Sequence, residues 1–206
     1  MYTPKQFTED NPQTLFDFMQ RHSFASLTSL HQGQLFATHL PFLLKQRGDQ
    51  LVLIGHMARA NPQGKTFLQQ EVLVVFAGPH CYVSPTWYHA APHVPTWNYT
   101  AVHAYGTPRL LEDEDAVHSV LRELVDHFEA FEAQPWQMEL PEEFRKNLQA
   151  AIVAFEIPVS RLEGKFKLSQ NRSPSERAGV IEALSQKTSD NERGVHHLMT
   201  TPFPRR

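Results

Sequence analysis

Two hydrophobic periods divide the first third of the chain. From Asn11 to about His22 apolar residues recur at helical spacing, and Asn11 followed by Pro12 is a typical helix start. After that, alternating residues and short apolar runs predict strands. They are expected at residues 24–30, 35–44 and 51–57, separated by the turns HQGQ and KQRGDQ. The pattern predicts an antiparallel meander.

The rest of the chain mixes strands with helices. A short helix is expected from Asn61-Pro62 to near Gln70, and Ser173 with Glu176 forms a capping-box motif that opens a last long helix. One or two further strands are expected in EVLVVFAGP and CYVSP, and others at 98–112 and in AIVAFEIPVSRLEGKFKLS. Further helices are expected within 112–143 and at 141–149. We therefore expect one domain over residues 1–206, α+β but mainly β. Its β-barrel core covers about 24–170, peripheral helices surround it, and a helical C-terminal extension covers about 173–199.

Composition narrows the class of protein. The chain has 206 residues, a formal net charge of -3 and one cysteine, which excludes a disulfide scaffold and a multi-cysteine metal cluster. No apolar stretch is long enough to span a bilayer, and the N-terminus lacks the pattern of a signal peptide, so a cytoplasmic protein is expected. The net charge argues against a strongly basic protein that coats nucleic acid.

Residues 72–108 contain no Asp, Glu, Lys or Arg. The same segment holds four histidines, five prolines and two of the three tryptophans. This segment has two interpretations: the buried middle of the fold, or the neutral, aromatic wall of a site for an uncharged planar ligand.

The exit of the third expected strand, GHMARANPQGK, carries the clearest candidate chemistry. Arg59 and Lys65 flank the expected helix start at Asn61, and a helix N-terminus beside cations favours an anion such as phosphate. An ordinary capped surface helix is the alternative. Gly64-Lys65-Thr66 resembles the end of a P-loop, but the first glycine of that motif is missing, which excludes a P-loop NTPase.

The histidines and aromatic residues give weaker signals. His39 lies on a strand among residues too polar for a plain core, but a structural role is the alternative. His89 and His93 are four residues apart, yet the prolines between and after them exclude the helix that such metal ligation needs, and no metal site is expected. Cys81 is expected to be a buried thiol.

Two Thr-Trp pairs, in SPTWY and VPTWNY, suit stacking on a flat heterocycle, although core plugs and dimer contacts use the same residues. A polar cluster precedes the helix that Ser173 opens, and it is either a second anion contact or a solvated strand end. Its residues are Lys165, Lys167, Ser169, Gln170, Asn171 and Arg172.

Taken together, the motifs resemble the PaiB family of FMN-binding negative transcriptional regulators, whose fold is similar to the split β-barrel of pyridoxamine-phosphate oxidases. The resemblance rests on ATHLP, GHMARANPQ, FAGPHCYVSPTWY, VPTWNYTAVHAYG and LEGKFKLSQNR, together with MYTPKQF, in this order along the chain. It implies an FMN-binding split β-barrel and a homodimer with FMN at the subunit interface. It also implies a role in repressing sporulation and degradative-enzyme genes.

Carried over to this sequence, the resemblance places Thr38 and His39 near the isoalloxazine. The phosphate would lie by His56, Arg59, Asn61 and Lys65. The remaining contacts would come from Ser84, Trp87, Trp97, Asn98, Lys167 and Gln170, some of them from the partner subunit.

Several functions stay open at this point. The negative charge and the lack of a clear helix-turn-helix argue against direct DNA binding and favour indirect repression. A flavin-dependent oxidoreductase is the alternative, with His39 or His56 as candidate proton donors. A heme-handling relative on the same barrel is a further alternative.

Overall fold

The computed structural model describes residues 1–90 and 92–201. This part of the chain forms two compact units, each built from segments that are distant in sequence. Unit 1 contains Met1–His22, Phe76–His103 and the described residues from Leu162 onward, and unit 2 contains Ser23–Val75 and Ala104–Arg161. The expectation of one domain over residues 1–206 stays a prediction.

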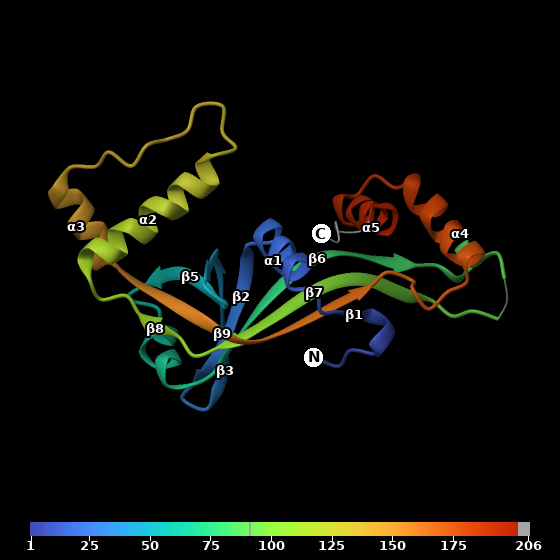
Figure 1. The fold of residues 1–206 in the computed structure, drawn as a ribbon, viewed down its shortest axis with the longest axis horizontal. Helices are drawn as coiled ribbons and strands as arrows, with labels where there is room; N and C mark the ends of the chain where they lie inside the picture. Colours follow the sequence, from blue (N-terminus) through green and yellow to red (C-terminus); the bar gives the residue numbers. More distant parts are fainter. Residues whose placement is uncertain (91, 202–206) are drawn as a thin grey trace. The chain divides into compact units, whose positions relative to one another are not determined.

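The strands form a nine-stranded sheet with the order β3-β2-β6-β7-β9-β5-β4, and β1 and β8 pair with β9 outside this path. Figure 1 labels these strands except β4. The strands are β1 (Thr8–Glu9), β2 (Phe24–His31), β3 (Gln34–Pro41), β4 (Leu43–Arg47), β5 (Gln50–Ala58), β6 (Val72–Val83), β7 (Thr96–Gly106), β8 (Arg109–Leu110) and β9 (Ile152–Lys167). The strand pairs are antiparallel where β1 pairs with β9, β2 with β3 and β6, β4 with β5, and β5 and β8 with β9.

Five α-helices and four short 3₁₀ helices complete the described chain. The α-helices are α1 (Pro12–Arg21), α2 (Glu114–Glu129), α3 (Glu142–Ala150), α4 (Pro174–Ser185) and α5 (Asp190–Thr200), and the 3₁₀ helices are η1 (Lys5–Phe7), η2 (Pro62–Lys65), η3 (Phe67–Gln69) and η4 (Pro85–Tyr88). Asn11 caps α1 through its side chain, and the capping box at Ser173 opens α4. Both helix starts were predicted from local sequence.

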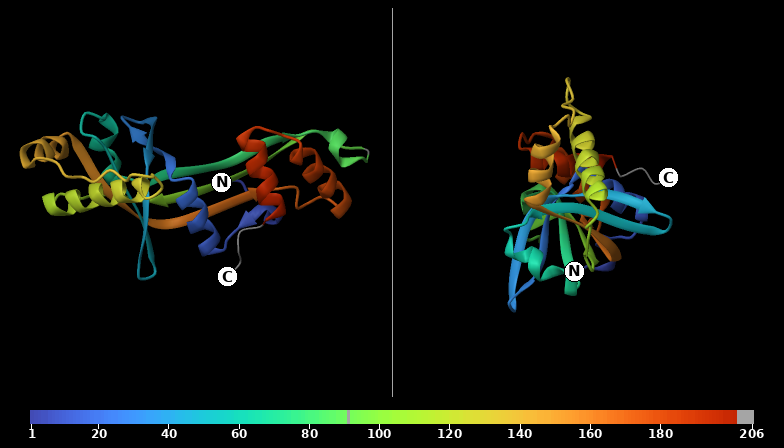
Figure 2. Two further views of the ribbon diagram at one scale, coloured as in Figure 1. Left: turned by 90° about the horizontal axis from the view of Figure 1, so that it is seen from above. Right: turned by 90° about the vertical axis from the view of Figure 1, so that its left-hand side faces the viewer.

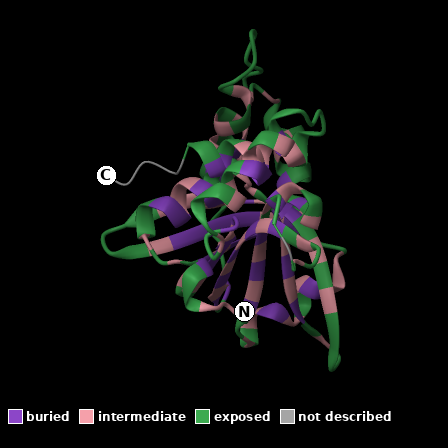
Figure 3. Cartoon of the chain, turned by 90° about the vertical axis from the view of Figure 1, so that its right-hand side faces the viewer, coloured by how far each residue is buried: buried purple, intermediate pink, exposed green. Residues whose placement is uncertain are grey.

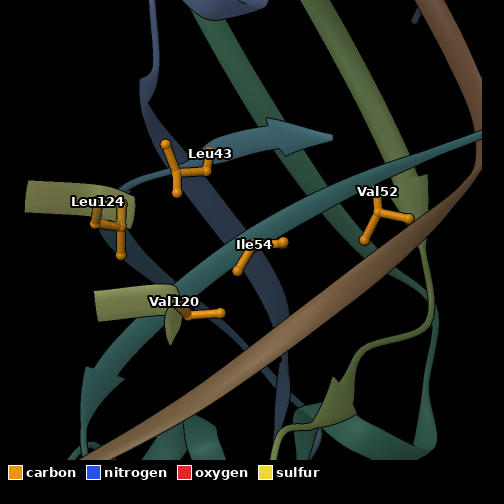
Figure 4. Close-up of a cluster of buried hydrophobic side chains, with 5 residues drawn as sticks. All are labelled: Leu43, Val52, Ile54, Val120 and Leu124. Atoms are coloured by element: carbon orange, nitrogen blue, oxygen red, sulfur yellow. The ribbon is translucent and has the colours of Figure 1, made fainter. Parts of the chain in front are cut away.

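Unit 2 has apolar packing on both faces of β5. Gly55 faces the rings of Phe42 and Phe155, which lie in the interior of the curled sheet. Because side chains alternate along a strand, Val52 and Ile54 face the opposite way. There α2 packs on the sheet with Val120 and Leu124, and Leu43 from β4 completes the cluster, as Figure 4 shows.

The α2–α3 pair belongs to unit 2. The two helices contact one another and lie side by side in both views of Figure 2. Arg59 holds the end of α3: its backbone N–H donates to the carbonyl of Ala151 at 2.8 Å, and its Nε donates to the carbonyl of Ala150 at 2.6 Å. The C-terminal end of α3 is therefore fastened to the segment that follows β5.

In unit 1, buried and exposed residues alternate along the strands, a pattern visible in Figure 3. Asn98, Thr100 and Val102 of β7 are buried. Trp97, the residue before Asn98, is 52% exposed, and Tyr82 on β6 is 45% exposed. One face of these strands is therefore covered and the other carries exposed aromatic rings.

Three expected elements differ from the observed ones. The expected strand 35–44 is two strands, β3 and β4, which separate at Phe42, a fully buried residue whose N–H donates to the carbonyl of Ser23. The expected strand 98–112 divides in the same way into β7 and β8. The expected helix 61–70 is replaced by η2 and η3, because Gln63 is drawn into the barrel and the chain turns more tightly than an α-helix.

Candidate functional site

The expected site residues fall on both units. Unit 2 carries Thr38, His39, His56, Arg59, Asn61 and Lys65, and unit 1 carries Ser84, Trp87, Trp97, Asn98, Lys167 and Gln170.

A hydrogen-bonded network joins β3 to η2 in unit 2. The Thr38 hydroxyl donates to Oε1 of Gln63 at 2.6 Å and accepts from Nδ2 of Asn61 at 3.0 Å. Asn61 in turn caps η2 by accepting from the backbone N–H of Gln63 at 3.0 Å. Thr38 and Asn61 therefore lie together, although the resemblance assigns Thr38 to the isoalloxazine and Asn61 to the phosphate, and part of their hydrogen-bonding capacity is already used inside the protein.

Gln63 is the centre of this network, and the sequence analysis missed it. Its side chain is fully buried, and its Nε2 donates to the Ser29 hydroxyl at 2.8 Å. The same nitrogen contacts the carbonyls of Leu27 and Phe36, each at 3.2 Å. Because a glutamine is usually exposed, nothing in the local pattern indicates this burial.

His39 lies on the opposite face of β3 from Thr38 and is exposed. Its ring stacks on the exposed ring of Phe24 across the β2–β3 hairpin, with centroids 6.2 Å apart and planes inclined by 26°. An exposed face with two flat rings can contact a planar ligand or another chain.

His56 lies near the end of β5, opposite Ala154 of β9, on the same face as Ile54. Its Nδ1 is buried and has no hydrogen-bond partner among the described residues. Burial lowers the pKa of His56, so its imidazole is held in the neutral form. A neutral ring is better suited to hydrogen bonding than to pairing with the charge of a phosphate.

A cavity of about 790 Å³ lies in unit 2 where β5 ends. Arg59 and Lys65 line it together with Gln149 and Lys146 of α3, as do the carboxylates of Glu112 and Glu114. The cavity is also lined by apolar residues, namely Leu110, Leu111, Val117, Ala150, Ile152, Val153 and Ala154. Its volume falls within the range of small-molecule sites, which is about 300–1,000 Å³.

The donors in this cavity exceed their partners. Arg59 uses Nε for the end of α3, whereas its two terminal nitrogens make no hydrogen bond to any described residue, and neither does Nζ of Lys65. Nε2 of Gln149 is buried and unpaired. Lys146 is already paired with Glu142 at 2.7 Å. Unpaired donors beside an apolar wall fit the phosphate end of a cofactor such as FMN.

The expected origin of the positive potential needs correction. The four residues of η2 have no appreciable helix dipole, so no helix N-terminus helps Arg59 and Lys65. The side chains themselves supply the charge. Arg59 also stabilises the carbonyl end of α3, which is a common role for a cation at a helix C-terminus.

In unit 1, Asn98 is almost fully buried and bonds Ser169 at the end of β9. Its Nδ2 donates to the Ser169 hydroxyl at 3.0 Å, and that hydroxyl lies 3.2 Å from Oδ1 of Asn98. Met199 of α5 contacts the same amide through its sulfur at 3.6 Å. Asn98 therefore joins β7, β9 and α5, and the geometry gives it a structural role.

The two expected tryptophans are in different environments. Ser84 caps η4, which carries Trp87, and Nζ of Lys187 lies 5.5 Å above the Trp87 ring. Trp97 is half exposed and forms a ledge with His80 and Tyr82, at centroid distances of 6.4 and 6.1 Å. The ledge is open for stacking, whereas Trp87 is partly covered.

Lys167 and Gln170 lie at the end of β9. Nζ of Lys167 donates to the hydroxyl of Thr96, and burial lowers the pKa of Lys167, with further contributions from Lys165 and Arg172. Among the described residues it has no carboxylate partner, so this region also favours an anion. Gln170, by contrast, folds back: its Oε1 accepts from the N–H of Leu168, and its Nε2 donates to the carbonyl of Phe166.

His93 is part of a cluster of polar contacts in unit 1. Its Nε2 lies 2.6 Å from Glu176 of α4, and its Nδ1 lies 3.2 Å from Nη1 of Arg172, which also covers the ring of Tyr88. No group of His, Cys, Asp and Glu within residues 1–90 and 92–201 has the arrangement of a metal site. The only cysteine, Cys81, is buried, and this burial raises its pKa to about 11.

The curled antiparallel sheet with peripheral helices and an anion-accepting cavity defines a split-barrel protein of the flavin-binding class. Two solved structures share the fold. The first is an FAD and heme binding protein from Mycobacterium smegmatis, with a TM-score of 0.60 and 17% identity, and the match covers 83% of this chain and 78% of that one. The second is the flavocytochrome Anf3 from Azotobacter vinelandii, with a TM-score of 0.58 and 15% identity, and the match covers 78% of this chain and 69% of that one.

The family follows from sequence similarity over most of the chain. The model of the family described as "Putative FMN-binding domain" matches residues 1–161. The "Protease synthase and sporulation protein PAI 2" of Bacillus subtilis is 37% identical over 202 residues, which cover 97% of this chain and 96% of that protein. An uncharacterized protein of Emericella nidulans is 30% identical over 241 residues, with coverage of 97% and 96%.

The chain therefore belongs to the PaiB family of FMN-binding split barrels. This confirms the family, the fold class and FMN as the cofactor, all expected from the sequence. The roles of the individual site residues stay predictions. Within the described residues no helix is both long and apolar enough to cross a membrane.

Proposed function

We propose that this protein is a cytoplasmic FMN-binding homodimer with a regulatory role of the PaiB type, affecting sporulation and degradative-enzyme genes without direct contact to DNA. The observation that carries the flavin part is the unit 2 cavity, where Arg59 and Lys65 present unpaired donors. FMN, when bound, supplies an isoalloxazine ring that can accept and donate electrons.

The phosphate end of FMN is assigned to unit 2. A phosphate monoester carries a charge of about -1.5 to -2 near neutral pH. The terminal nitrogens of Arg59 and the Nζ of Lys65 have the charge to bind it, and charge-assisted hydrogen bonds of this kind are the strong ones. Thr38 and Asn61 hold β3 and η2 together, and the imidazole of His56 on β5 is held in the neutral form.

The ring end is assigned to the aromatic surfaces. In unit 2, His39 and Phe24 present exposed rings, and in unit 1 Trp97 and Tyr82 do the same. We assign the unit 1 contribution to a second copy of the chain, including Ser84, Trp87 and Lys167. Exposed apolar surface of this kind is typical of an interface, which supports a homodimer.

The regulatory role follows from the relation to PAI 2, whose name refers to protease synthesis and sporulation. Charge argues against DNA as the direct target, because residues 112–143 hold eleven acidic residues and one arginine. The C-terminal helices α4 and α5 also mix both charge signs. Phosphate backbones are bound by concentrated positive charge, which these surfaces lack.

The test is the absorption spectrum of the purified protein followed by FMN titration of flavin-free protein. Arg59→Ala and Lys65→Ala should each weaken FMN binding about 10- to 150-fold, the loss expected for a hydrogen bond to a charged group. Arg193→Ala, on an exposed position of α5, is the matched control. Unchanged affinity in both site variants would place the phosphate elsewhere.

The same sample separates the proposed role from an enzyme. Rapid reduction of the bound flavin by a nicotinamide cofactor, with reoxidation by a small molecule, would favour an oxidoreductase and contradict a purely regulatory role. A Soret band in place of flavin absorption would show heme.

A separate measurement tests whether the protein is a dimer. Sedimentation equilibrium should give twice the 23.6 kDa chain mass. Trp97→Ala should lower both the fraction of dimer and the affinity for riboflavin, which has the ring and no phosphate. A monomeric protein that binds FMN normally would overturn this part of the proposal.

A further inference from the structure

Gln149 lies in the last turn of α3, in an unusual environment for a glutamine. It lies one position before the end of α3, its side chain is 9% exposed, and its Nε2 is buried without a hydrogen-bond partner. Its Oε1 is the end that is satisfied, by Nη1 of Arg145 one turn earlier at 3.4 Å. This contact orients the amide, so the unpaired group is the donor.

A buried donor without a partner is costly. It has lost its hydrogen bonds to water and has gained none in the protein, and few buried polar side-chain atoms in native structures are left in this state. Methionine or leucine would fill the same space without that cost. The polar group therefore fits a partner that the chain itself does not supply.

The surroundings indicate the chemistry of that partner. Gln149 lines the same cavity as Arg59 and Lys65, and these three residues contribute unpaired donors from α3, from the segment after β5 and from η2. A group that satisfies all three must have several acceptor oxygens and negative charge. A tetrahedral phosphate monoester meets this requirement, because each oxygen can accept from a different direction.

The other charged residues of the cavity do not change this assignment. Lys146 is paired with Glu142, and Glu112 and Glu114 are exposed, as Arg59 and Lys65 are, so water screens their repulsion of an anion as it screens the attraction by the two cations. Their carboxylates are acceptors, which suits a ligand that carries hydroxyl groups next to its phosphate.

We propose that Gln149 is a phosphate ligand supplied by α3, so that binding of a phosphate-bearing flavin fastens the α2–α3 pair to the barrel. This rests on the proposed function, because it takes FMN as the ligand. The hydrogen bonds from Arg59 to Ala150 and Ala151 already hold the end of α3 next to the phosphate. Occupancy of the site is thereby coupled to the order of an acidic surface element.

The decisive variant is Gln149→Met, which keeps the side-chain volume and removes the unpaired donor. In flavin-free protein this change should raise the midpoint of thermal unfolding by about 2–4 °C, because a buried unsatisfied group is lost. The same change should weaken FMN binding about tenfold and leave riboflavin binding unchanged. A purely structural glutamine would not give opposite effects on stability and affinity.

Hydrogen exchange measures the coupling to α3. FMN should protect the amides of residues 142–151 in the wild-type protein, riboflavin should not, and Gln149→Met should abolish the effect of FMN. Inorganic phosphate at millimolar concentration should give part of the protection. Gln137→Met, an exposed glutamine outside the cavity, is the matched control.

Two failures can be told apart. If Arg59→Ala weakens FMN binding and Gln149→Met does not, the phosphate site stands and the role of Gln149 is wrong. If neither change affects FMN affinity, the phosphate is not in this cavity and the proposed function loses its main support. Equal loss of FMN and riboflavin affinity in Gln149→Met would also contradict a phosphate contact.

Discussion

At the scale of single residues, Gln63 shows how a polar side chain can organise a barrel. Its amide contacts Thr38, Ser29 and two main-chain carbonyls while it is fully excluded from water. A completely satisfied buried amide rigidifies the strands that it joins. Thr38 and Asn61 are positioned through it, so Gln63 supports the site without facing the cavity.

Replacing Gln63 with leucine should reveal this role as a loss of stability. The change leaves the buried partners on β2 and β3 unsatisfied, which should cost about 2–4 kcal/mol in the free energy of unfolding. Urea denaturation followed by far-UV circular dichroism measures it. Gln69→Leu, on the exposed side of η3, is the matched control and should change stability by less than about 0.5 kcal/mol. Equal effects of the two substitutions would contradict the role of the network.

Three partly buried histidines make the stability depend on pH. Burial lowers the pKa of His22, His56 and His103, with smaller contributions from Arg21 at His22 and from the N-terminus at His103. Each therefore binds a proton less readily in the folded than in the unfolded chain. Their stabilising contribution is complete above the unfolded value of 6.5 and is lost as pH falls through the lowered folded values.

The expected outcome is a free energy of unfolding that is smaller at pH 5.5 than at pH 7.5. His56→Gln should reduce this difference, because it removes a group that must stay neutral in the fold. The exposed His39, replaced in the same way, is the control and should leave the difference unchanged. Urea titrations at the two pH values measure it. A steeper decline in His56→Gln would show that another interaction controls the acid response.

At the scale of elements, close backbone contacts set the packing of the helices in unit 1. A Cβ on Gly179 of α4 would lie 2.1 Å from the carbonyl oxygen of Trp87 in η4. Only glycine allows this approach, so the aromatic turn with Ser84 and Trp87 lies directly on the helix. The capping box at Ser173 fixes where that helix begins.

Gly179→Ala should therefore separate α4 from η4. Overpacking of this kind should cost about 1–3 kcal/mol, although alanine is the better helix former. Near-UV circular dichroism should show a changed environment of Trp87, and urea denaturation measures the loss of stability. Glu182→Ala, at an exposed position of the same helix, is the control. An increase in stability would show that η4 moves away from the added methyl group without loss of stability.

At the scale of the whole molecule, charge is distributed unevenly. The net charge is only -3, but residues 112–143 are strongly acidic, whereas residues 72–108 carry no Asp, Glu, Lys or Arg. Arg59 and Lys65, which have no anionic partner among the described residues, both line the cavity. This distribution favours a small anionic ligand over a polyanion such as DNA.

The purified, flavin-loaded protein should accordingly show no sequence-specific DNA binding. A mobility-shift assay at 50 and 200 mM salt measures this, because true phosphate contacts weaken steeply between these concentrations. The assay uses the full chain, which includes α4 and α5. Tight, salt-sensitive and sequence-specific binding would overturn the view that regulation is indirect.

Much of the fold could be predicted from local sequence. The cap at Asn11, the capping box at Ser173, the alternation along β2 and the apolar run of β5 depend on residues a few positions apart. The break at Phe42 and the 3₁₀ turns after Asn61 could not be predicted, because burial of Phe42 and Gln63 in the barrel overrides the local pattern there.

By itself, the sequence determined the family, the cofactor and the presence of Arg59 and Lys65 after a strand. Only the tertiary structure decided which groups meet them. Gln63 contacts a carbonyl 36 positions away, and Arg59 contacts one 91 positions away. Likewise Gln149, which is unremarkable in its helix, becomes an unpaired donor in a cavity that it shares with Arg59 and Lys65. The desolvation of a group depends on the residues that surround it in space, and these cannot be read from its neighbours in the sequence.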